Sequence, residues 1–441
     1  MAQREGEARA GEAPLSHPSA RILLAAVLAG VLGGGAAIAF REAVRLINAL
    51  VYGFDVEQMA SAAQGLAWWW PPLVLGLGGL AVGLYVHYVL PERRPQGVAD
   101  VIEATALHGA GLNLRHGLTT GLGAALGLGF GASVGREGPV VHLGASLAAW
   151  LGRVLAAPTS ARRVLLGSGV AAAVAASFNA PLAGVFFALE VVVGRFAFAA
   201  FAPVALGATA GTLLSHLRYG ADPAFVVPQN WGLVSLSELP AFLILGLLAA
   251  LAAWLFVFST FLVDGAFRRL ACPRVLRPAV AGLAVGGLAI LDPRILGVGY
   301  EATSTVLAGG LGLWDLVLLG ALKVAATALC LGSGFVGGVF SPSLFLGCML
   351  GGAFGLVAAA IQPELASAHG AYALVGMGAV AGAVLGAPIS TAVMMVELTG
   401  DFAFTVMVLS ATVLASLGAR GLGLRSFFHA QLERRAQSSS R

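Results

Sequence analysis

The stretch Gly135-Arg136-Glu137-Gly138-Pro139 places two charges between glycines and just before a proline, inside a long apolar region. The residues before it, 117–135, contain no Asp, Glu, Lys or Arg, and the apolar sequence resumes directly after the proline. The acid of this stretch is therefore expected at membrane depth, where an ionisable residue is a functional hypothesis by default.

A proline at this place is typical of the first position of a helix, because the N–H that proline lacks is not needed there. The other N–H groups of a helix start attract anions. A carboxylate tethered at a helix start can occupy the anion site itself, and it can leave when it is protonated or displaced. The stretch therefore predicts an anion site with Glu137 as its plug.

The composition indicates an all-α, multi-pass integral membrane protein in a lipid bilayer. Of 441 residues, 58% are hydrophobic and only 10% are charged, against roughly 25% charged in soluble proteins. The 61 glycines favour closely packed and broken helices over a soluble enzyme core. Cys272, Cys330 and Cys348 show no metal-ligand spacing. We expect no cofactor, no metal and no nucleic-acid partner. The uncharged runs approach or exceed the roughly 20 residues of a spanning helix: Ile22 to Phe40, Leu66 to Leu90, Val164 to Leu189, Ala197 to Leu217, Val324 to Pro363 and Phe402 to Ala419.

Arginines gather before the first apolar run and after the last one. By the positive-inside rule both termini are expected in the cytoplasm, with the protein in the inner (plasma) membrane of the cell. We expect residues 1–20 to form a polar cytoplasmic arm. Residues 420–441 are expected to form a basic cytoplasmic tail that is too short for a regulatory domain.

The apolar region contains an internal repeat. Residues 169–181 (GVAAAVAASFNAP) align without gaps with residues 376–388 (GMGAVAGAVLGAP), and Glu190 and Glu397 follow the two prolines at the same interval. Pro139 to Gly144 has the same spacing as Pro342 to Gly347, with Glu137 matched by Phe340. Duplicated halves with helices broken by Gly and Pro predict a transport site where the repeats meet. We expect a first repeat over residues 21–230, a joint at 231–239 and a second repeat over 240–419.

At these residues the chain resembles the ClC family of chloride channels and proton-coupled chloride antiporters. Gly135 to Pro139 matches the family motif GREGP letter for letter, Gly338 to Pro342 matches GxFxP, and the Ala-Pro-Leu-Ala-Gly run at 180–184 agrees as well. The resemblance extends from the first span to Ala419. It implies an inverted-repeat domain of many tilted, partly re-entrant helices that works as a homodimer with one pore per subunit.

Within this family, chloride is the transported ligand and protons are the second partner. The resemblance implies that Glu137 is the gating and proton-transferring glutamate. It implies anion-binding positions at the two helix starts, namely Arg136 and Gly138 in the first motif and Gly338, Val339 and Phe340 in the second. Arg136 is also a candidate for a structural role, which we favour.

Three departures from the family pattern affect the mechanism. Gln96-Gly97 stands where the family has a serine that meets the ion, and an amide N–H can still donate. We align Phe402 with the tyrosine of the central site, and phenylalanine cannot donate a hydrogen bond. Glu190-Val191 stands where many antiporters have two acids, the second of which relays protons. Val191 therefore favours uncoupled or weakly coupled chloride conductance, with Glu190 as a candidate proton relay and strict H⁺/Cl⁻ exchange as the alternative.

Two functions from other classes are also considered. An intramembrane serine hydrolase would use Ser168 or Ser333 with His142 as its base, but no spacing pairs a histidine with either serine. A proton-coupled organic anion carrier is disfavoured by the small, glycine-lined site. We therefore predict a transport protein and not an enzyme. Lys323 is expected either to raise the potential of an inner vestibule or to reach the membrane interface.

Overall fold

The computed structural model describes residues 18–54, 61, 65–194, 196, 198–221, 225, 236–363, 368–400 and 402–439. Residues 1–17 of the expected polar arm and 231–235 of the expected joint lie outside this range, so both predictions rest on the sequence alone. Across the described ranges the chain is helical, and its extended backbone pairing is one isolated bridge between Gly135 and Gly338.

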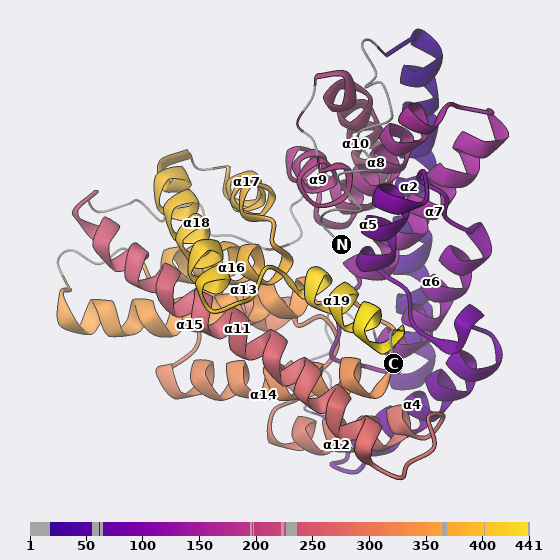
Figure 1. Ribbon diagram of the computed structural model, residues 1–441. Helices are drawn as coiled ribbons and strands as arrows, with labels where there is room; N and C mark the ends of the chain where they lie inside the picture. The colour runs from indigo at the N-terminus through magenta and orange to yellow at the C-terminus, as the bar shows by residue number, and fades with distance from the viewer. Residues whose placement is uncertain are drawn as a thin grey trace. The chain divides into compact units, whose positions relative to one another are not determined.

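Helices follow one another along the described parts of the chain (Figure 1). The first half contains α2 (Ala20–Tyr52), α4 (Trp70–Tyr88), η2 (Pro91–Arg93), α5 (Val98–Leu107), α6 (Leu114–Gly129), α7 (Glu137–Val154), α8 (Thr159–Phe178), α9 (Pro181–Phe187), the π-helix η3 (Ala188–Val193) and α10 (Phe198–Tyr219). The second half contains η4 (Leu236–Glu238), α11 (Leu239–Arg269), α12 (Arg277–Leu291), η5 (Pro293–Ile295), α13 (Tyr300–Leu307), α14 (Leu313–Ser333), α15 (Phe340–Ile361), α16 (His369–Leu385), α17 (Pro388–Thr399), η6 (Phe402–Phe404), α18 (Thr405–Gly421) and α19 (Phe427–Ser439).

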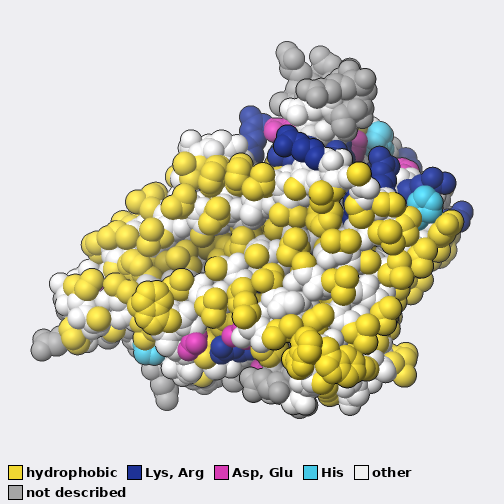
Figure 2. Space-filling model, turned by 90° about the horizontal axis from the view of Figure 1, so that it is seen from below, with side chains coloured by type: hydrophobic (Ala, Val, Ile, Leu, Met, Phe, Trp, Pro, Cys, Tyr) yellow, Lys and Arg dark blue, Asp and Glu magenta, His cyan; other side chains and the backbone are white. Residues whose placement is uncertain are grey.

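Seven of the described helices are long and apolar enough to cross a bilayer: α2, α4, α8, α10, α11, α14 and α15. Their outward faces carry large apolar side chains, such as Leu247, Leu251 and Leu255 on α11. Figure 2 shows a face of the molecule on which hydrophobic side chains predominate, with charged side chains at its margins. Apolar surface of this extent is unusual for a protein in water and is typical of one that faces lipid.

The chain folds into two compact units, each assembled from separate segments. Unit 1 consists of Met1–Glu42, Gln96–Leu122 and Glu137–Ala224, and unit 2 consists of Ala43–Pro95, Gly123–Arg136 and Phe225–Arg441. One buried helix forms the centre of each unit: α8 packs against α7 and α10 in unit 1, and α16 packs against α15 and α18 in unit 2.

Glycines let these central helices touch their neighbours backbone to backbone. In unit 1, a Cβ added to Gly144 of α7 would lie 2.7 Å from the carbonyl oxygen of Gly169 in α8. In unit 2, a Cβ added to Gly347 of α15 would lie 2.2 Å from the carbonyl oxygen of Gly376 in α16. These four glycines are matched pairs in the sequence repeat, so the same close crossing is built twice. Contacts of this kind are how small residues hold membrane helices together.

The broken helices of the repeat are also built alike. α8 is capped by Asn179 and α16 by Gly386, both in the left-handed conformation with φ of 57° and 69°. Pro181 and Pro388 then open α9 and α17. An Asn or Gly at the end of one helix and a proline at the start of the next are the residues that such a break requires.

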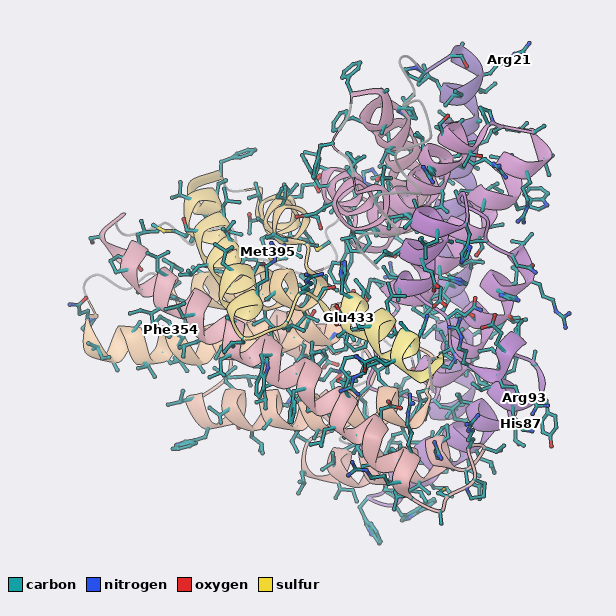
Figure 3. All side chains as sticks on the ribbon, in the orientation of Figure 1. Arg21, His87, Arg93, Phe354, Met395 and Glu433 are labelled. Atoms are coloured by element: carbon teal, nitrogen blue, oxygen red, sulfur yellow. The ribbon has the colours of Figure 1, made fainter. Side chains whose placement is uncertain are left out.

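The C-terminal tail is a docked helix, which the sequence analysis did not anticipate. α19 packs within unit 2, where the Phe427 ring stacks on Phe261 of α11 at 5.3 Å. The Arg434 guanidinium carbon lies 4.1 Å from the centroid of the Phe261 ring. Phe428 and Leu432, one helical turn apart, are both buried. Figure 3 shows Glu433 on this helix.

Candidate functional site

Glu137 lies at the start of a helix, as its sequence predicted, but inside the first turn. α7 begins at Glu137 itself and Pro139 is its third residue, so the expectation that the proline opens the helix is corrected by two positions. The acid is 1% exposed. A negative charge is favoured in the first turn, because it faces the positive end of the helix dipole. Gly138, the second residue of α7, is buried in the same turn.

The backbone just before Glu137 is paired with the second motif. Within unit 2, the N–H of Gly135 donates to the carbonyl of Gly338, and the N–H of Gly338 donates to the carbonyl of Gly135, both at 2.7 Å. A Cβ on the neighbouring Gly337 would lie 2.4 Å from the Val134 side chain. The glycines of both motifs therefore allow two loops to approach until their backbones hydrogen-bond.

The second motif starts a helix without an acid, as predicted. α15 begins at Phe340, with Val339 before it as the N-cap, and both residues are buried. Ser343 donates its hydroxyl to the Phe340 carbonyl at 2.6 Å, which fixes the first turn. Glu137 and Phe340 are matched in the repeat, and each is the first residue of its helix. The two helix starts thus differ in whether their first side chain is a carboxylate.

Arg136 has a structural contact. Its guanidinium carbon lies 4.8 Å from the centroid of the Tyr300 ring, within cation–π range. The Tyr300 hydroxyl is 3.5 Å from the Ser341 hydroxyl, at the long limit of a hydrogen bond. A structural role for Arg136 stays a prediction, and the contact with Tyr300 is the observation that supports it.

The motif Gln96-Gly97, which departs from the family pattern, lies at the start of a short helix in unit 1. α5 begins after Gly97, whose N–H donates to the Asp100 carboxylate at 2.8 Å. The Gln96 amide nitrogen lies 3.0 Å from Nδ1 of His116. The Gln96 amide, which was expected to face an ion, contacts His116. The Asp100 carboxylate accepts the N–H of the N-cap residue, Gly97.

Phe402 is placed where it cannot contribute to a buried site. It begins η6 and is 79% exposed. The prediction that Phe402 stands for the tyrosine of the central site is therefore wrong. Phe428, near the start of α19, is buried at 6% exposure. The start of that helix packs on the break after α16, where a Cβ at Gly386 would lie 2.8 Å from the Ser426 side chain.

We therefore predict that Phe402→Tyr leaves chloride affinity unchanged, because an exposed hydroxyl stays in contact with solvent or lipid. Phe428→Tyr is the contrasting variant, since it adds a hydroxyl at a buried helix start. A new hydrogen bond to an anion is worth about 1.5–3 kcal/mol. Calorimetric titration with chloride measures both, and a tighter complex in Phe402→Tyr alone would restore the original assignment.

Glu190 and Val191 lie in the π-helical segment η3, which continues α9. The segment ends at Gly194 with φ of 67°, whereas the matching helix α17 ends at Gly400 with φ of 65°. From proline to terminal glycine the first copy is one residue longer (13 positions, 181 to 194, against 12, 388 to 400). A π turn is the way a helix absorbs a single inserted residue, and such turns are frequent at functional sites.

Lys323 is a buried residue whose contacts the sequence did not reveal. It is 0% exposed in the middle of α14 and therefore does not reach the interface. Its ammonium donates to the carbonyls of Ile295 at 2.9 Å and Gly297 at 2.7 Å. The signal in the sequence was a single lysine within an apolar run, which predicts burial with partners but does not identify them.

The two serines of the hydrolase hypothesis are engaged in their own helices. Ser168 donates its hydroxyl to the Val164 carbonyl at 3.0 Å, and Ser333 donates to the Cys330 carbonyl at 2.9 Å. Inside membrane helices, serine hydroxyls commonly donate a hydrogen bond to a backbone carbonyl of the preceding turn. Neither bond prepares a serine for attack on a substrate.

Comparisons with known proteins agree with the resemblance read from the motifs. The profile of a family described as voltage gated chloride channel matches residues 78–420. The chain is 35% identical, over 95% of its length and 98% of the relative, to a ClcB-like protein of Ralstonia nicotianae. It is 29% identical to the H⁺/Cl⁻ exchange transporter ClcA of Vibrio cholerae, covering 94% of this chain and 89% of that protein.

A solved structure is similar over nearly the whole chain. It is the crystal structure of a slow cyanobacterial Cl⁻/H⁺ antiporter, with a TM-score of 0.85 at 25% identity. The alignment covers 97% of this chain and 100% of that one. The predicted helical membrane fold is thereby confirmed.

Proposed function

Because this chain belongs to the voltage-gated chloride channel (ClC) family, we propose that it carries chloride across the membrane along a pathway gated by Glu137. Chloride transport is the activity of the family, whose members act as transporters or channels and not as enzymes. The observation that supports Glu137 as the gate is the pair of matched helix starts, one with a buried carboxylate and one without. A chloride ion and a carboxylate suit the same N–H groups, so they compete for them.

We propose that the backbone supplies most of the anion-binding groups. At the start of α15 these are the N–H groups of Val339 and Phe340, and at the start of α7 the N–H of Gly138. Gly338 supports the site through its backbone, because its N–H already donates to the Gly135 carbonyl. Gly97 offers a third helix start, although Asp100 already accepts its N–H. Backbone N–H groups of buried helix starts bind anions without a fixed side-chain charge. Arg136, Gln96 and Phe428 are proposed as residues that shape these positions.

The transport mode we propose is uncoupled or weakly coupled chloride conductance. Its support is Val191, because a proton that crosses a low-dielectric interior needs a titratable residue or a chain of waters. The placement of Phe402 removes the second argument for this mode. Strict H⁺/Cl⁻ exchange is the second candidate, and the π turn at Glu190 favours it. Glu190 lies within this π turn, and such turns are frequent at functional sites.

The test uses purified protein in liposomes with an imposed chloride gradient, recording chloride and proton fluxes together. Uncoupled conductance predicts chloride efflux without uphill proton movement, both in the unaltered protein and in Glu190→Gln. Robust proton pumping would contradict this mode, and loss of the pumping in Glu190→Gln would identify Glu190 as the relay. Glu397→Gln is the matched control, because Glu397 holds the same place in the second repeat. Absence of chloride flux would contradict the proposed function itself.

We further propose a homodimer with one pore per subunit, set in the cell's inner (plasma) membrane with both termini in the cytoplasm, and transport that requires no cofactor. The arginines that flank the spans support this orientation. The repeats are proposed to run over residues 21–230 and 240–419.

A further inference from the structure

We propose that Lys323 is a positioning residue that holds the loop from which Glu137 projects. The inference rests on the proposed function, because it concerns the same gate. It is carried by a continuous set of contacts within unit 2 that runs from the Lys323 ammonium to Arg136, the residue that precedes Glu137 in the chain.

The first step is the ammonium itself. It lies in the middle of a spanning helix, fully buried, where an unpaired charge would be expensive. Its contacts are two backbone carbonyls, those of Ile295 and Gly297, and the ring of Phe345, whose centroid is 5.0 Å away. The two hydrogen bonds join Lys323 to the backbone of residues 295 and 297, so the lysine cross-links α14 to this loop.

The second step is that the same loop is bonded to the segment that carries the first motif. The Ser133 hydroxyl donates to the Ile295 carbonyl at 2.9 Å, so this oxygen accepts from both Ser133 and Lys323. The N–H of Gly297 donates to the Gly131 carbonyl at 3.1 Å. Residues 295–297 are thus held on one side by Lys323 and on the other by residues 131–133.

The third step leads from residues 131–133 to the acid. Gly135 is bonded in both directions to Gly338, and the Arg136 guanidinium packs over the Tyr300 ring. Tyr300 starts α13, directly after the loop that Lys323 holds. The residues before Glu137 are therefore fixed by backbone bonds at one end and by a ring contact at the other. The 295–300 segment contacts this stretch at two places, residues 131–133 and Arg136.

Replacement of Lys323 should therefore change how Glu137 is held without altering Glu137 itself. In Lys323→Met the side chain keeps its length and loses the two bonds. Each lost hydrogen bond is expected to change the gating equilibrium by roughly 2- to 10-fold. We expect the pH at which chloride flux is half-maximal to shift, because the carboxylate is no longer held in its position. Ser133→Ala removes one bond to the same carbonyl and should shift the profile in the same direction by a smaller amount.

The experiment measures chloride flux against pH in liposomes for the full chain and these variants. Ser168→Ala is the matched control, since it also removes a buried serine hydroxyl bonded to a carbonyl, within its own helix. Lys323→Gln retains two N–H donors without the charge and should restore part of the profile. If Lys323→Met does not insert into liposomes, the comparison of Ser133→Ala with Ser168→Ala decides the proposal.

The Glu137→Gln background separates the two proposals. A positioning role predicts that Lys323→Met has no effect on the pH profile when Glu137 is already glutamine. If Lys323→Met lowers flux equally at every pH, with and without Glu137, the residue does not act through the gate and the inference is overturned. Unaltered profiles in Lys323→Met and Ser133→Ala, with a pH-insensitive Glu137→Gln, would overturn this inference alone. A Glu137→Gln variant that keeps its pH dependence would instead overturn the proposed function.

Discussion

Glu137→Gln is expected to make chloride flux independent of pH and to abolish any proton movement coupled to it. Glutamine has nearly the shape of protonated glutamate and cannot carry the negative charge that competes with chloride at a helix start. At a pH where the carboxylate is ionised, we expect flux to rise by about tenfold, the change that corresponds to a plug held by about 1.4 kcal/mol. Flux into liposomes, recorded across a pH series, measures this.

Glu137→Ala extends the same prediction. Loss of the side chain opens space at the start of α7 as well as removing the charge, so a further anion should bind where the carboxylate was. Chloride titration by calorimetry should then report more bound chloride than in Glu137→Gln. Glu301→Gln is the control, because Glu301 is an acid in the first turn of another helix, α13. Retention of the original pH profile in both Glu137 variants would show that Glu137 is not the gating residue.

The helix starts of the site could be predicted from sequence because they depend on local chemistry. A proline and glycines around one acid determine where a helix begins, and the repeat supplied a second, independent indication at Phe340. The two-residue error at Pro139 has a physical reason: proline is tolerated throughout the first turn, since none of the first N–H groups has a partner within the helix.

Phe402 could not be placed from sequence because nothing local distinguishes an aromatic residue beside a pathway from one at the surface. An aromatic residue of either kind can follow a helix end and lie near an apolar run. The docked tail was missed for a related reason. Phe428 and Leu432 give the tail an apolar pattern of only one helical turn. A short helix of this kind is stable only when it packs on another surface, and here Phe427 packs on Phe261.

The partners of Lys323 were beyond sequence reasoning altogether. Its acceptors are backbone carbonyls, which every residue has, so no residue type marks them. The loop of Ile295 and Gly297 is close to Lys323 only in the folded unit. The π turn at Glu190 was hidden for a different reason, because the interval from proline to glutamate is the same in both repeats and the additional residue enters only afterwards.

The central helix crossings carry the second large prediction: Gly347→Ala should prevent unit 2 from folding correctly. An added methyl carbon would lie 2.2 Å from the Gly376 carbonyl oxygen and 2.7 Å from the Met377 Cα. Both are backbone atoms of a fully buried helix, so relief requires α15 and α16 to separate. Overpacking typically costs about 1–3 kcal/mol, and a clash with backbone on a central helix should exceed that range.

Two further alanine variants make the prediction specific to the crossing. Gly144→Ala, the matched position of unit 1, places its methyl 2.7 Å from the Gly169 oxygen and should destabilise less than Gly347→Ala. Gly287→Ala lies in α12 with no atom within 4 Å of the added carbon. There alanine should be neutral or stabilise by up to about 1 kcal/mol, through its better helix propensity. Thermal unfolding in detergent, followed by size-exclusion chromatography, ranks the three. Equal stability of Gly347→Ala and Gly287→Ala would show that the helices do not approach as closely as their glycines allow.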